Sequence, residues 1–242
     1  MRVLAIIPAR GGSKGVPRKN IKLLNGRPLL SYTVESALGS SRLDEVVLST
    51  DDNEIAELGR QLGVSVPFMR PPELSDDSAP TFPVVMHAVE QLENAGLNFD
   101  AVCLLQPTNP LRKSKDIDGC IDLLETTGAD SVVSVLSVPH QYNPKWVYLP
   151  NENGELELST GECSPVARRQ DLPPAFHRDG SVYVTRREVL DNYGDLYGRK
   201  LRGYEIDPDR SVNIDTLEDW ILAERIFHRR GRSVRENKLY CS

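Results

Sequence analysis

Residues 3–20 read VLAIIPARGGSKGVPRKN and join a short apolar run to a glycine-rich loop. The run at 3–8 predicts a buried β-strand, because it is apolar until it reaches a proline. Gly11, Gly12 and Gly15 allow the backbone to approach a ligand closely, so that successive N–H groups can converge on an anion. The loop also carries four cations, which are Arg10, Lys14, Arg18 and Lys19.

This loop matches neither of the common phosphate-binding patterns. It lacks GxxxxGK[ST], and its glycines do not fall in the order GxGxxG. A solvated basic surface loop is the alternative to an anion site. We favour the anion site, and a polyphosphate as its ligand, because parallel α/β sheets bind ligands beyond the carboxyl ends of their strands.

The rest of the chain alternates between short apolar runs and helical periodicity. Strands are predicted at 45–50, 101–106, 131–138 and 181–185, and helices at 28–39, 52–63, 81–96, 114–128 and 216–230. This order predicts right-handed βαβ units. We therefore expect a three-layer α/β/α fold with a mostly parallel sheet that helices cover on both faces.

The periodicity also assigns buried faces to the helices. The first and last predicted helices should bury Leu30, Val34, Ala37 and Leu38, and Leu217, Trp220, Ile221 and Phe227. Ser114 is expected to cap the helix that follows it, because serine is a favoured N-cap residue.

One segment interrupts the α/β pattern. Residues 139–178 are rich in Pro, Gly and Asn, lack helical periodicity, and are expected to form short strands or an arm. We therefore divide the chain into an α/β domain of 1–138 and 179–230, an inserted arm of 139–178, and a polar tail of 231–242. The tail is expected to be poorly ordered.

Composition narrows the function classes. The chain has 242 residues and a formal net charge of -6, which argues against broad binding to nucleic acid or membranes. No apolar run is long enough to span a bilayer, and the N-terminus does not resemble a signal peptide, so we expect a cytoplasmic protein. The four cysteines have no metal-ligand spacing, and we expect reduced thiols with Cys103 and Cys120 buried.

Motifs along nearly the whole chain resemble those of the CMP-sialic acid synthetases, or acylneuraminate cytidylyltransferases, a family that includes legionaminic and pseudaminic acid cytidylyltransferases. After the opening loop, they are STDD (49–52), RPPELSDDSAPT (70–81), LLQPTNPLR (104–112), RRQDLPPAFHRDGSVYV (168–184) and SVNIDT (211–216). The resemblance implies a Rossmann-like, nucleotide-diphospho-sugar transferase-like fold with an inserted dimerisation arm. It also implies a nucleotidyltransferase that transfers CMP from CTP to the anomeric hydroxyl of a nonulosonic acid, with Mg²⁺ as cofactor and pyrophosphate as product.

The resemblance assigns roles on the nucleotide side of the site. It implies nucleotide binding by Arg10, Ser13, Lys14, Lys19, Asn20, Arg70 and Thr81. Arg10, Lys19 and Asp215 are the expected catalytic residues, because such reactions depend on positioning and charge stabilisation. The alternative for Arg70 is a surface ion pair with Glu73 or Asp76.

A second set of residues is expected to bind the sugar. It comprises Gln106, Thr108, Asn109, Arg112, Lys145, Arg168, Arg169, Phe176 and Tyr183. Gln106, Thr108 and Asn109 form a polar turn that alternatively only caps the next helix. Lys145, Arg168 and Arg169 are candidates for the substrate carboxylate, lent by one chain of a homodimer to the other. The alternative is an oligomer contact without a catalytic part.

The SVNIDT motif is the candidate metal site, with Asp215 and Asn213 as the ligands of Mg²⁺. Asp215 alternatively serves as a helix N-cap, with Glu218 completing a capping box. The family usually has Asp-x-Asp here, and Asn213 replaces the first aspartate, so residue 213 is not a general base. A non-catalytic nucleotide-binding protein, or the same chemistry on a legionaminic, pseudaminic or Kdo-type acid, remain the alternatives.

Overall fold

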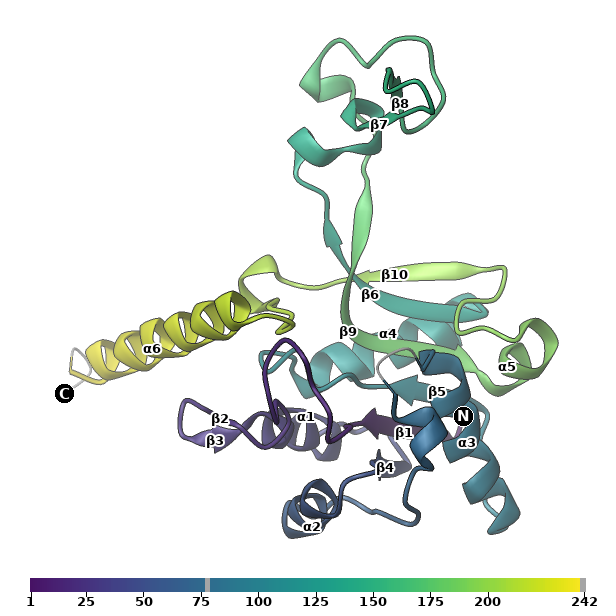
Figure 1. The fold of residues 1–242 in the computed structure, drawn as a ribbon, viewed down its shortest axis with the longest axis vertical. Helices are drawn as coiled ribbons and strands as arrows, with labels where there is room; N and C mark the ends of the chain where they lie inside the picture. Colours follow the sequence, from purple (N-terminus) through teal and green to yellow (C-terminus); the bar gives the residue numbers. More distant parts are fainter. Residues whose placement is uncertain (77–78, 240–242) are drawn as a thin grey trace.

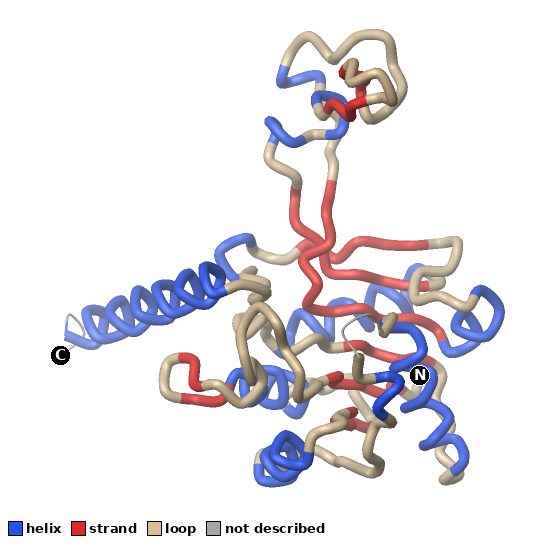
Figure 2. Tube along the Cα trace, in the orientation of Figure 1, coloured by secondary structure: helices blue, strands red, loops and turns tan. Residues whose placement is uncertain are grey.

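The first strand of the chain lies inside a six-stranded sheet with the order β10-β6-β9-β5-β1-β4 (Figure 1, Figure 2). The computed structural model describes residues 1–76 and 79–239, and side chains as far as residue 230. The strands of this sheet are β1 (Val3–Pro8), β4 (Glu45–Ser49), β5 (Ala101–Leu104), β6 (Ser131–Ser137), β9 (Phe176–Arg186) and β10 (Leu201–Glu205). Only β9 among them runs antiparallel to its neighbours.

Helices cover both faces of the sheet. On one face lie α1 (Leu29–Leu38), α2 (Asn53–Gln61) and α4 (Ser114–Thr127), and on the other α3 (Thr81–Asn94) and α5 (Arg187–Tyr193). Alternate residues of β1 enter the two cores: Val3, Ala5 and Ile7 pack on the first face, and Leu4 and Ile6 on the second. The predicted three-layer α/β/α fold with a mostly parallel sheet is confirmed.

A third core lies beyond the carboxyl ends of the strands. There α6 (Leu217–Leu239) packs on the opening loop and on the hairpin of β2 (Leu23–Leu24) and β3 (Arg27–Pro28). Trp220 and Ala223 of α6 are buried, whereas Leu217 and Ile221 are 50% and 48% exposed. The prediction that both are buried is therefore wrong, because only one narrow face of α6 meets the body from which the helix projects (Figure 1).

Two other details of the helices differ from expectation. Leu38, at the last turn of α1, is 49% exposed, so its predicted burial is wrong. Ser114 is the first residue of α4 rather than its cap. The N-terminus of α4 is instead stabilised by Asp116, whose carboxylate accepts a hydrogen bond of 2.9 Å from the N–H of Lys113.

The segment between β6 and β9 projects from the body as an arm (Figure 1). It contains the short helices η2 (His140–Tyr142), η3 (Pro144–Trp146) and η4 (Arg169–Asp171) and the hairpin of β7 (Tyr148–Pro150) and β8 (Leu156–Leu158). The indole N–H of Trp146 donates to the carbonyl oxygen of Val166 at 2.6 Å, which ties η3 to the returning chain. The paired ends of β6 and β9 form its stem, where Ser137 lies opposite Phe176.

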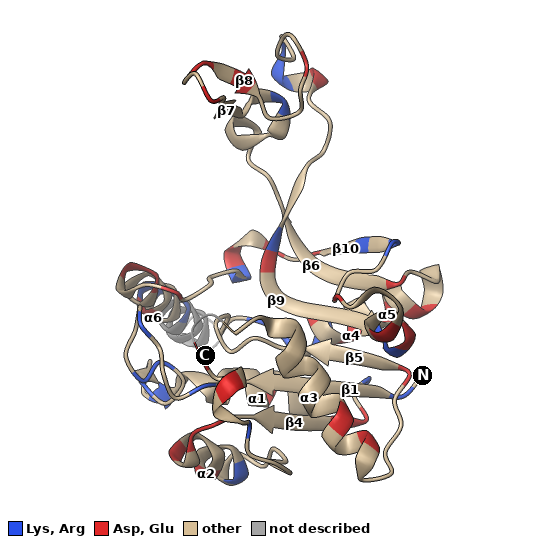
Figure 3. Cartoon of the chain, turned by 45° about the vertical axis from the view of Figure 1, so that its right-hand side comes forward, with Lys and Arg blue, Asp and Glu red and all other residues tan. Residues whose placement is uncertain are grey.

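The C-terminal part of the chain is helical for longer than the sequence indicates. Helix α6 runs through residues 231–239 of the predicted polar tail, and residues 240–242 of that tail lie outside the described residues. Basic and acidic residues alternate along the elements of the body in the view of Figure 3. No helix in the described part of the chain combines the length and apolar character needed to cross a membrane.

Cys103 and Cys120 are buried free thiols, as predicted, and burial raises the pKa of Cys103 to about 12. Cys163 is exposed on the arm. Cys241 lies outside the described residues.

Candidate active site

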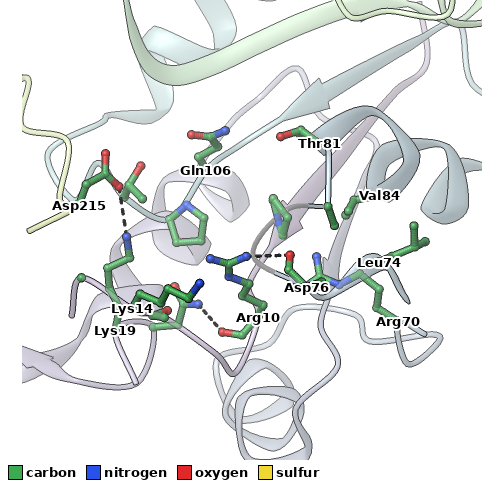
Figure 4. A pocket seen from close by; sticks show the side chains of 17 residues that line it. Arg10, Lys14, Lys19, Arg70, Leu74, Asp76, Thr81, Val84, Gln106 and Asp215 are labelled. Carbon is green, nitrogen blue, oxygen red and sulfur yellow. Dashed lines mark hydrogen bonds and ion pairs between the residues drawn. The ribbon is translucent and has the colours of Figure 1, made fainter. Parts of the chain in front are cut away.

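A cavity of about 500 Å³ opens beyond the carboxyl ends of β1 and β5 (Figure 4). Its walls come from the opening loop, the segment around η1 (Pro72–Leu74) with the start of α3, the turn after β5, and the loop before α6. The expected nucleotide-binding residues that line it are Arg10, Ser13, Lys14, Lys19, Asn20, Arg70 and Thr81, and Gln106, Thr108 and Asp215 join them.

The opening loop is held against the end of β4 and against itself. The N–H of Gly11 donates to Asp51 at 3.1 Å, and the buried side chain of Asn20 donates to the carbonyl oxygen of Arg10 at 3.0 Å. Arg10 in turn donates to the carbonyl oxygen of Asp76 at 2.9 Å. These bonds fix the loop around the cavity.

The four cations of the loop divide into two groups. Arg10, Lys14 and Lys19 line the cavity. Arg18 instead forms ion pairs with Asp52 and Glu54 at the start of α2. Its backbone is left-handed, with φ 53°. Three of the four positive charges are therefore placed where a polyphosphate would be bound.

Lys19 connects this loop to the last part of the chain. Its Nζ donates to the carbonyl oxygen of Ile214 at 2.7 Å and lies 3.4 Å from Oδ1 of Asp215. The other carboxylate oxygen of Asp215 accepts a 2.6 Å bond from the amide Nδ2 of Asn213. The backbone of Gly15 lies close to that of Asp215, since a Cβ on Gly15 would lie 2.0 Å from the carbonyl oxygen of Asp215.

The N-terminus of α6 is capped by Thr216 and Asp219. The Asp219 carboxylate accepts hydrogen bonds from the N–H groups of Asp215 and Thr216 at 3.0 and 2.8 Å, and Thr216 Oγ1 accepts from the N–H of Asp219 at 3.2 Å. The predicted capping box of Asp215 and Glu218 is therefore wrong by one residue. Asp215 is released from capping and faces the cavity.

Arg70 is buried on the opposite wall. It donates to Asp51 at 3.4 Å and to the hydroxyl of Ser75 at 3.1 Å. Burial lowers the pKa of Arg70, and the charge of Asp51 acts in the opposite direction. Asp51 was not among the expected site residues, although its place in STDD, directly after a strand, was a signal of the kind that identified the opening loop.

The side chains of the turn after β5 lie in two layers. Gln106 and Thr108 line the cavity, whereas Asn109 and Arg112 are buried behind its wall. Asn109 donates to Asp179 at 3.2 Å, and Arg112 donates to the carbonyl oxygens of Gln106 and Ser181 at 3.1 and 2.5 Å. Burial lowers the pKa of Arg112 to about 10. In this structure Asn109 and Arg112 contact protein rather than the cavity.

The remaining expected substrate residues are spread over β9 and the arm. Tyr183 is buried on β9, and its hydroxyl oxygen approaches Gly180 near Gln106. Phe176 lines a separate depression of about 380 Å³ at the base of the arm. Lys145 forms an ion pair with Glu162, Arg168 pairs with Asp171, and Arg169 lies in η4, all on the arm.

The donor set near Asp215 fits a Mg²⁺ ion that also binds substrate phosphates. Among the described side chains, no group of three or more His, Cys, Asp or Glu residues gathers around one point. Mg²⁺ commonly needs only one or two carboxylates when phosphate oxygens and waters complete its shell. Asp215 supplies one such carboxylate at the edge of the cavity. The amide nitrogen of Asn213 donates to that carboxylate, so its amide oxygen is the atom with which Asn213 could join Asp215 as a ligand.

The sequence matches the cytidylyltransferase family over residues 4–217. The chain therefore belongs to the cytidylyltransferase family and is a nucleotidyltransferase, of the type to which the acylneuraminate cytidylyltransferases belong. The resemblance seen in its motifs is confirmed.

Three relatives illustrate this relationship. The chain is 35% identical to the CMP-N,N'-diacetyllegionaminic acid synthase of Legionella pneumophila, across 94% of this chain and 97% of that protein. It is 33% identical to a pseudaminic acid cytidylyltransferase of Campylobacter jejuni, with the same coverage of 94% and 97%. It is 33% identical to N-acylneuraminate cytidylyltransferase A of Danio rerio across 95% of this chain, which spans only 51% of that relative.

The fold also resembles a solved structure of CMP:2-keto-3-deoxy-manno-octonic acid synthetase complexed with CTP. The TM-score is 0.71 at 18% sequence identity, over 95% of this chain and all of the other. At this identity the likeness concerns the fold, which is that of the nucleotide-diphospho-sugar transferases.

Proposed function

We propose that this protein transfers CMP from CTP to the anomeric hydroxyl of a nine-carbon nonulosonic acid and releases pyrophosphate. The observation that carries the proposal is one cavity with two chemically different halves. Cations of the opening loop line one half, and uncharged hydrogen-bonding groups from the turn after β5 line the other. The relatives named for legionaminic, pseudaminic and acylneuraminic acids support an acidic sugar as the acceptor.

In the nucleotide half, Arg10, Ser13, Lys14 and Lys19 bind the triphosphate. Their charges neutralise the phosphate oxygens and stabilise the charge that develops on the leaving pyrophosphate. Arg70 and Thr81 lie across the cavity from this loop and bind the cytosine, while Asn20 supports the loop from behind through Arg10. An arginine held by Asp51 and Ser75 presents its donors in a fixed direction, which suits a base carbonyl.

In the sugar half, Gln106 and Thr108 bind hydroxyl groups, and Tyr183 contributes from β9. The acceptor hydroxyl is then held in line with the α-phosphorus. Its oxygen loses its proton to solvent and bonds to the phosphorus, and the bond from the α-phosphorus to the bridging oxygen breaks to release pyrophosphate. Asp215 would hold Mg²⁺ at the edge of the cavity. The bound ion supplies Lewis-acid stabilisation of phosphoryl charge.

The arm is proposed to join two copies of the chain. Lys145, Arg168, Arg169 and Phe176 lie on it or at its base, away from the cavity of their own chain. A homodimer that inserts each arm toward its partner's cavity would bring cations to the substrate carboxylate.

The test is pyrophosphate release with CTP, Mg²⁺ and a panel of N-acetylneuraminic, N,N'-diacetyllegionaminic, pseudaminic and Kdo-type acids. UTP and ATP serve as controls. Release with CTP and one of the three nine-carbon acids supports the proposal and selects the acceptor. Release with the Kdo-type acid alone would support CMP transfer but contradict a nine-carbon acceptor. CTP binding without release with any acid would contradict the transferase assignment and favour a protein that only binds nucleotide.

A further inference from the structure

A buried polar network lies behind the sugar half of the cavity, and Arg112 is at its centre. Only 6% of Arg112 is exposed, and its Nη1 donates to the carbonyl oxygens of Gln106 and Ser181 at 3.1 and 2.5 Å. Its Nε donates to the hydroxyl of Ser36 on α1 at 3.2 Å. Arg112 therefore ties the turn after β5 to strand β9 and to α1.

A second layer of bonds runs parallel to the first. Asp179 of β9 is 5% exposed and accepts hydrogen bonds from the amide of Asn109 at 3.2 Å and from the hydroxyl of Ser181 at 2.6 Å. The amide oxygen of Asn109 accepts from the N–H of Leu111 at 3.1 Å. The turn after β5 and strand β9, which Arg112 joins, are thus also joined through Asp179.

The hydrogen bonds of Arg112 do not pair its charge with a carboxylate. The oxygens that accept from Arg112 are neutral, and its Nη2 has no hydrogen-bond partner among the described residues. Burying a cation without a bonded carboxylate is costly, and apolar residues of similar volume often stabilise a core better. The guanidinium instead fixes the orientation of two segments, because its planar fork binds carbonyl groups on both of them.

The segments held in this way form a polar surface around Gly180. Strand β9 changes register here, since Tyr183 lies opposite Val133 but Arg178 lies opposite Val135. Gly180 has a φ of 83°, and a Cβ on it would lie 3.9 Å from Oε1 of Gln106. The same point is 4.0 Å from Oδ1 of Asn213 and from the hydroxyl of Tyr183. Bulges of this kind commonly re-aim side chains beside active sites.

We propose that Arg112 and Asp179 are positioning residues that hold Gln106 and the irregular part of β9 in place for the acidic sugar. They act through Gln106 and Tyr183 rather than on the substrate itself. This inference rests on the proposed function, because it assigns the sugar to that half of the cavity. Its specific consequence is that loss of the network weakens sugar binding and leaves nucleotide binding intact.

The main test compares Arg112→Lys with a matched control, Arg186→Lys. Arg186 also donates to backbone carbonyls, those of Ala129 at 2.8 Å and Leu124 at 3.2 Å, but at the other end of β9. A lysine ammonium cannot reproduce the fork that reaches three oxygens. With the acid that the wild-type enzyme uses best, we expect Arg112→Lys to raise KM for the sugar at least tenfold. KM for CTP should stay within twofold, and Arg186→Lys should change neither value.

A milder variant covers the case in which Arg112→Lys does not fold. Ser181→Ala removes the hydroxyl that donates to Asp179 and keeps the carbonyl that Arg112 uses, so we expect the same selective rise in the sugar KM, about threefold to tenfold. Amide hydrogen exchange provides a second readout. The Arg112 and Ser181 variants should exchange faster in 106–111 and 179–183, and Arg186→Lys should not.

Two results would overturn the inference. One is a kinetic result for Arg112→Lys and Ser181→Ala in which the KM for the sugar does not rise, or rises together with the KM for CTP. The other is unchanged exchange in both segments of these variants. If the proposed function itself is wrong, the result differs: the wild-type protein releases no pyrophosphate with any acid of the panel. In that case the exchange comparison still decides whether the network positions these segments.

Discussion

The Nζ of Lys19 lies 3.4 Å from Oδ1 of Asp215, although 196 residues separate them in the chain. Asn213 donates to the other oxygen of the same carboxylate at 2.6 Å. Asp215 is thereby oriented by one group from the opening loop and one from its own loop, and the helix cap beside it is made by other residues. Its carboxylate is available to the cavity.

Replacing this carboxylate should abolish turnover and spare the fold. For Asp215→Asn we expect kcat to fall at least about a hundredfold, because a protein ligand of Mg²⁺ supplies several kcal/mol of charge stabilisation in phosphoryl transfer. The thermal midpoint should match that of wild type, since Thr216 and Asp219 still cap α6. Glu218→Gln is the control on the first turn of α6 and should keep full activity. Normal activity of Asp215→Asn with normal Mg²⁺ dependence would refute the metal role.

Two glycines of the opening loop should respond differently to the same substitution. Gly15→Ala places a Cβ 2.0 Å from the carbonyl oxygen of Asp215, so the two loops must separate. We expect it to lower the free energy of unfolding by about 1–3 kcal/mol and to weaken CTP binding. A Cβ on Gly12 meets no atom within 4 Å, and Gly12→Ala should change stability by less than about 0.5 kcal/mol. Urea unfolding and calorimetric CTP titration measure both effects, and equal behaviour of the two variants would contradict the close approach.

Arg70 should contribute to nucleotide affinity and to the choice of base. Arg70→Lys removes the fork that Asp51 and Ser75 orient, and we expect the Kd for CTP to rise at least tenfold while weaker UTP binding changes less. Arg60→Lys, on the exposed surface of α2, is the control and should bind CTP normally. Titration calorimetry with both nucleotides checks this prediction. A loss of equal size for CTP and UTP would mean that Arg70 does not read the base.

The cap of α2 should make stability depend on pH. Burial alone would raise the pKa of Asp52, but hydrogen bonds from Arg18 and from the N–H groups of Ile55 and Glu54 outweigh it and lower the pKa. The contribution of Asp52 is therefore fully present above pH about 4, its ordinary pKa, and is lost as the pH falls through the lower folded-state value.

Asp52→Ala is the variant that measures this contribution. It should lower the free energy of unfolding by about 1 kcal/mol at pH 7, and the difference from wild type should shrink toward pH 2.5. Glu57→Ala, on the same helix, should differ little from wild type across this range. A difference between Asp52→Ala and wild type that stays constant with pH would contradict the assignment.

The arm should determine the oligomeric state. Tyr142, Leu149 and Leu156 are exposed on it. We expect a dimer by light scattering and a monomer for the double variant Leu149→Asp, Leu156→Asp. The monomer should keep its affinity for CTP and lose at least tenfold in kcat/KM for the sugar acid, since the arm of a second copy is proposed to supply Lys145 and Arg169. A monomer with full activity would refute the shared site.

The order of strands and helices was predictable because each element is a strong local pattern. Buried runs such as VLAIIP and the periodic face of α3 need no tertiary information to be recognised. Burial at the ends of elements was less predictable. Leu38, Leu217 and Ile221 continue a periodic apolar face, but the neighbouring segments do not extend far enough to cover them.

In the candidate site, too, some residues were predictable from local sequence and others were not. The cations of the opening loop were identified by their place after a strand, and three of them line the cavity. Asn109 and Arg112 follow a strand in the same way, yet they turn behind the wall, because the turn of Pro107 to Pro110 and the irregular β9 decide their direction. The cap of α6 was misplaced by one residue even though Thr216 and Asp219 fit the capping spacing as well as Asp215 and Glu218 do.

The contact of Lys19 with Ile214 and Asp215 also bears on how the protein is made. The cavity combines a loop with a carboxylate that is synthesised 196 residues after Lys19. Closing a contact of such sequence separation costs more chain entropy than closing a local one. A nascent chain that has not yet reached the loop before α6 therefore carries the opening loop but lacks the wall of the cavity to which Asp215 belongs.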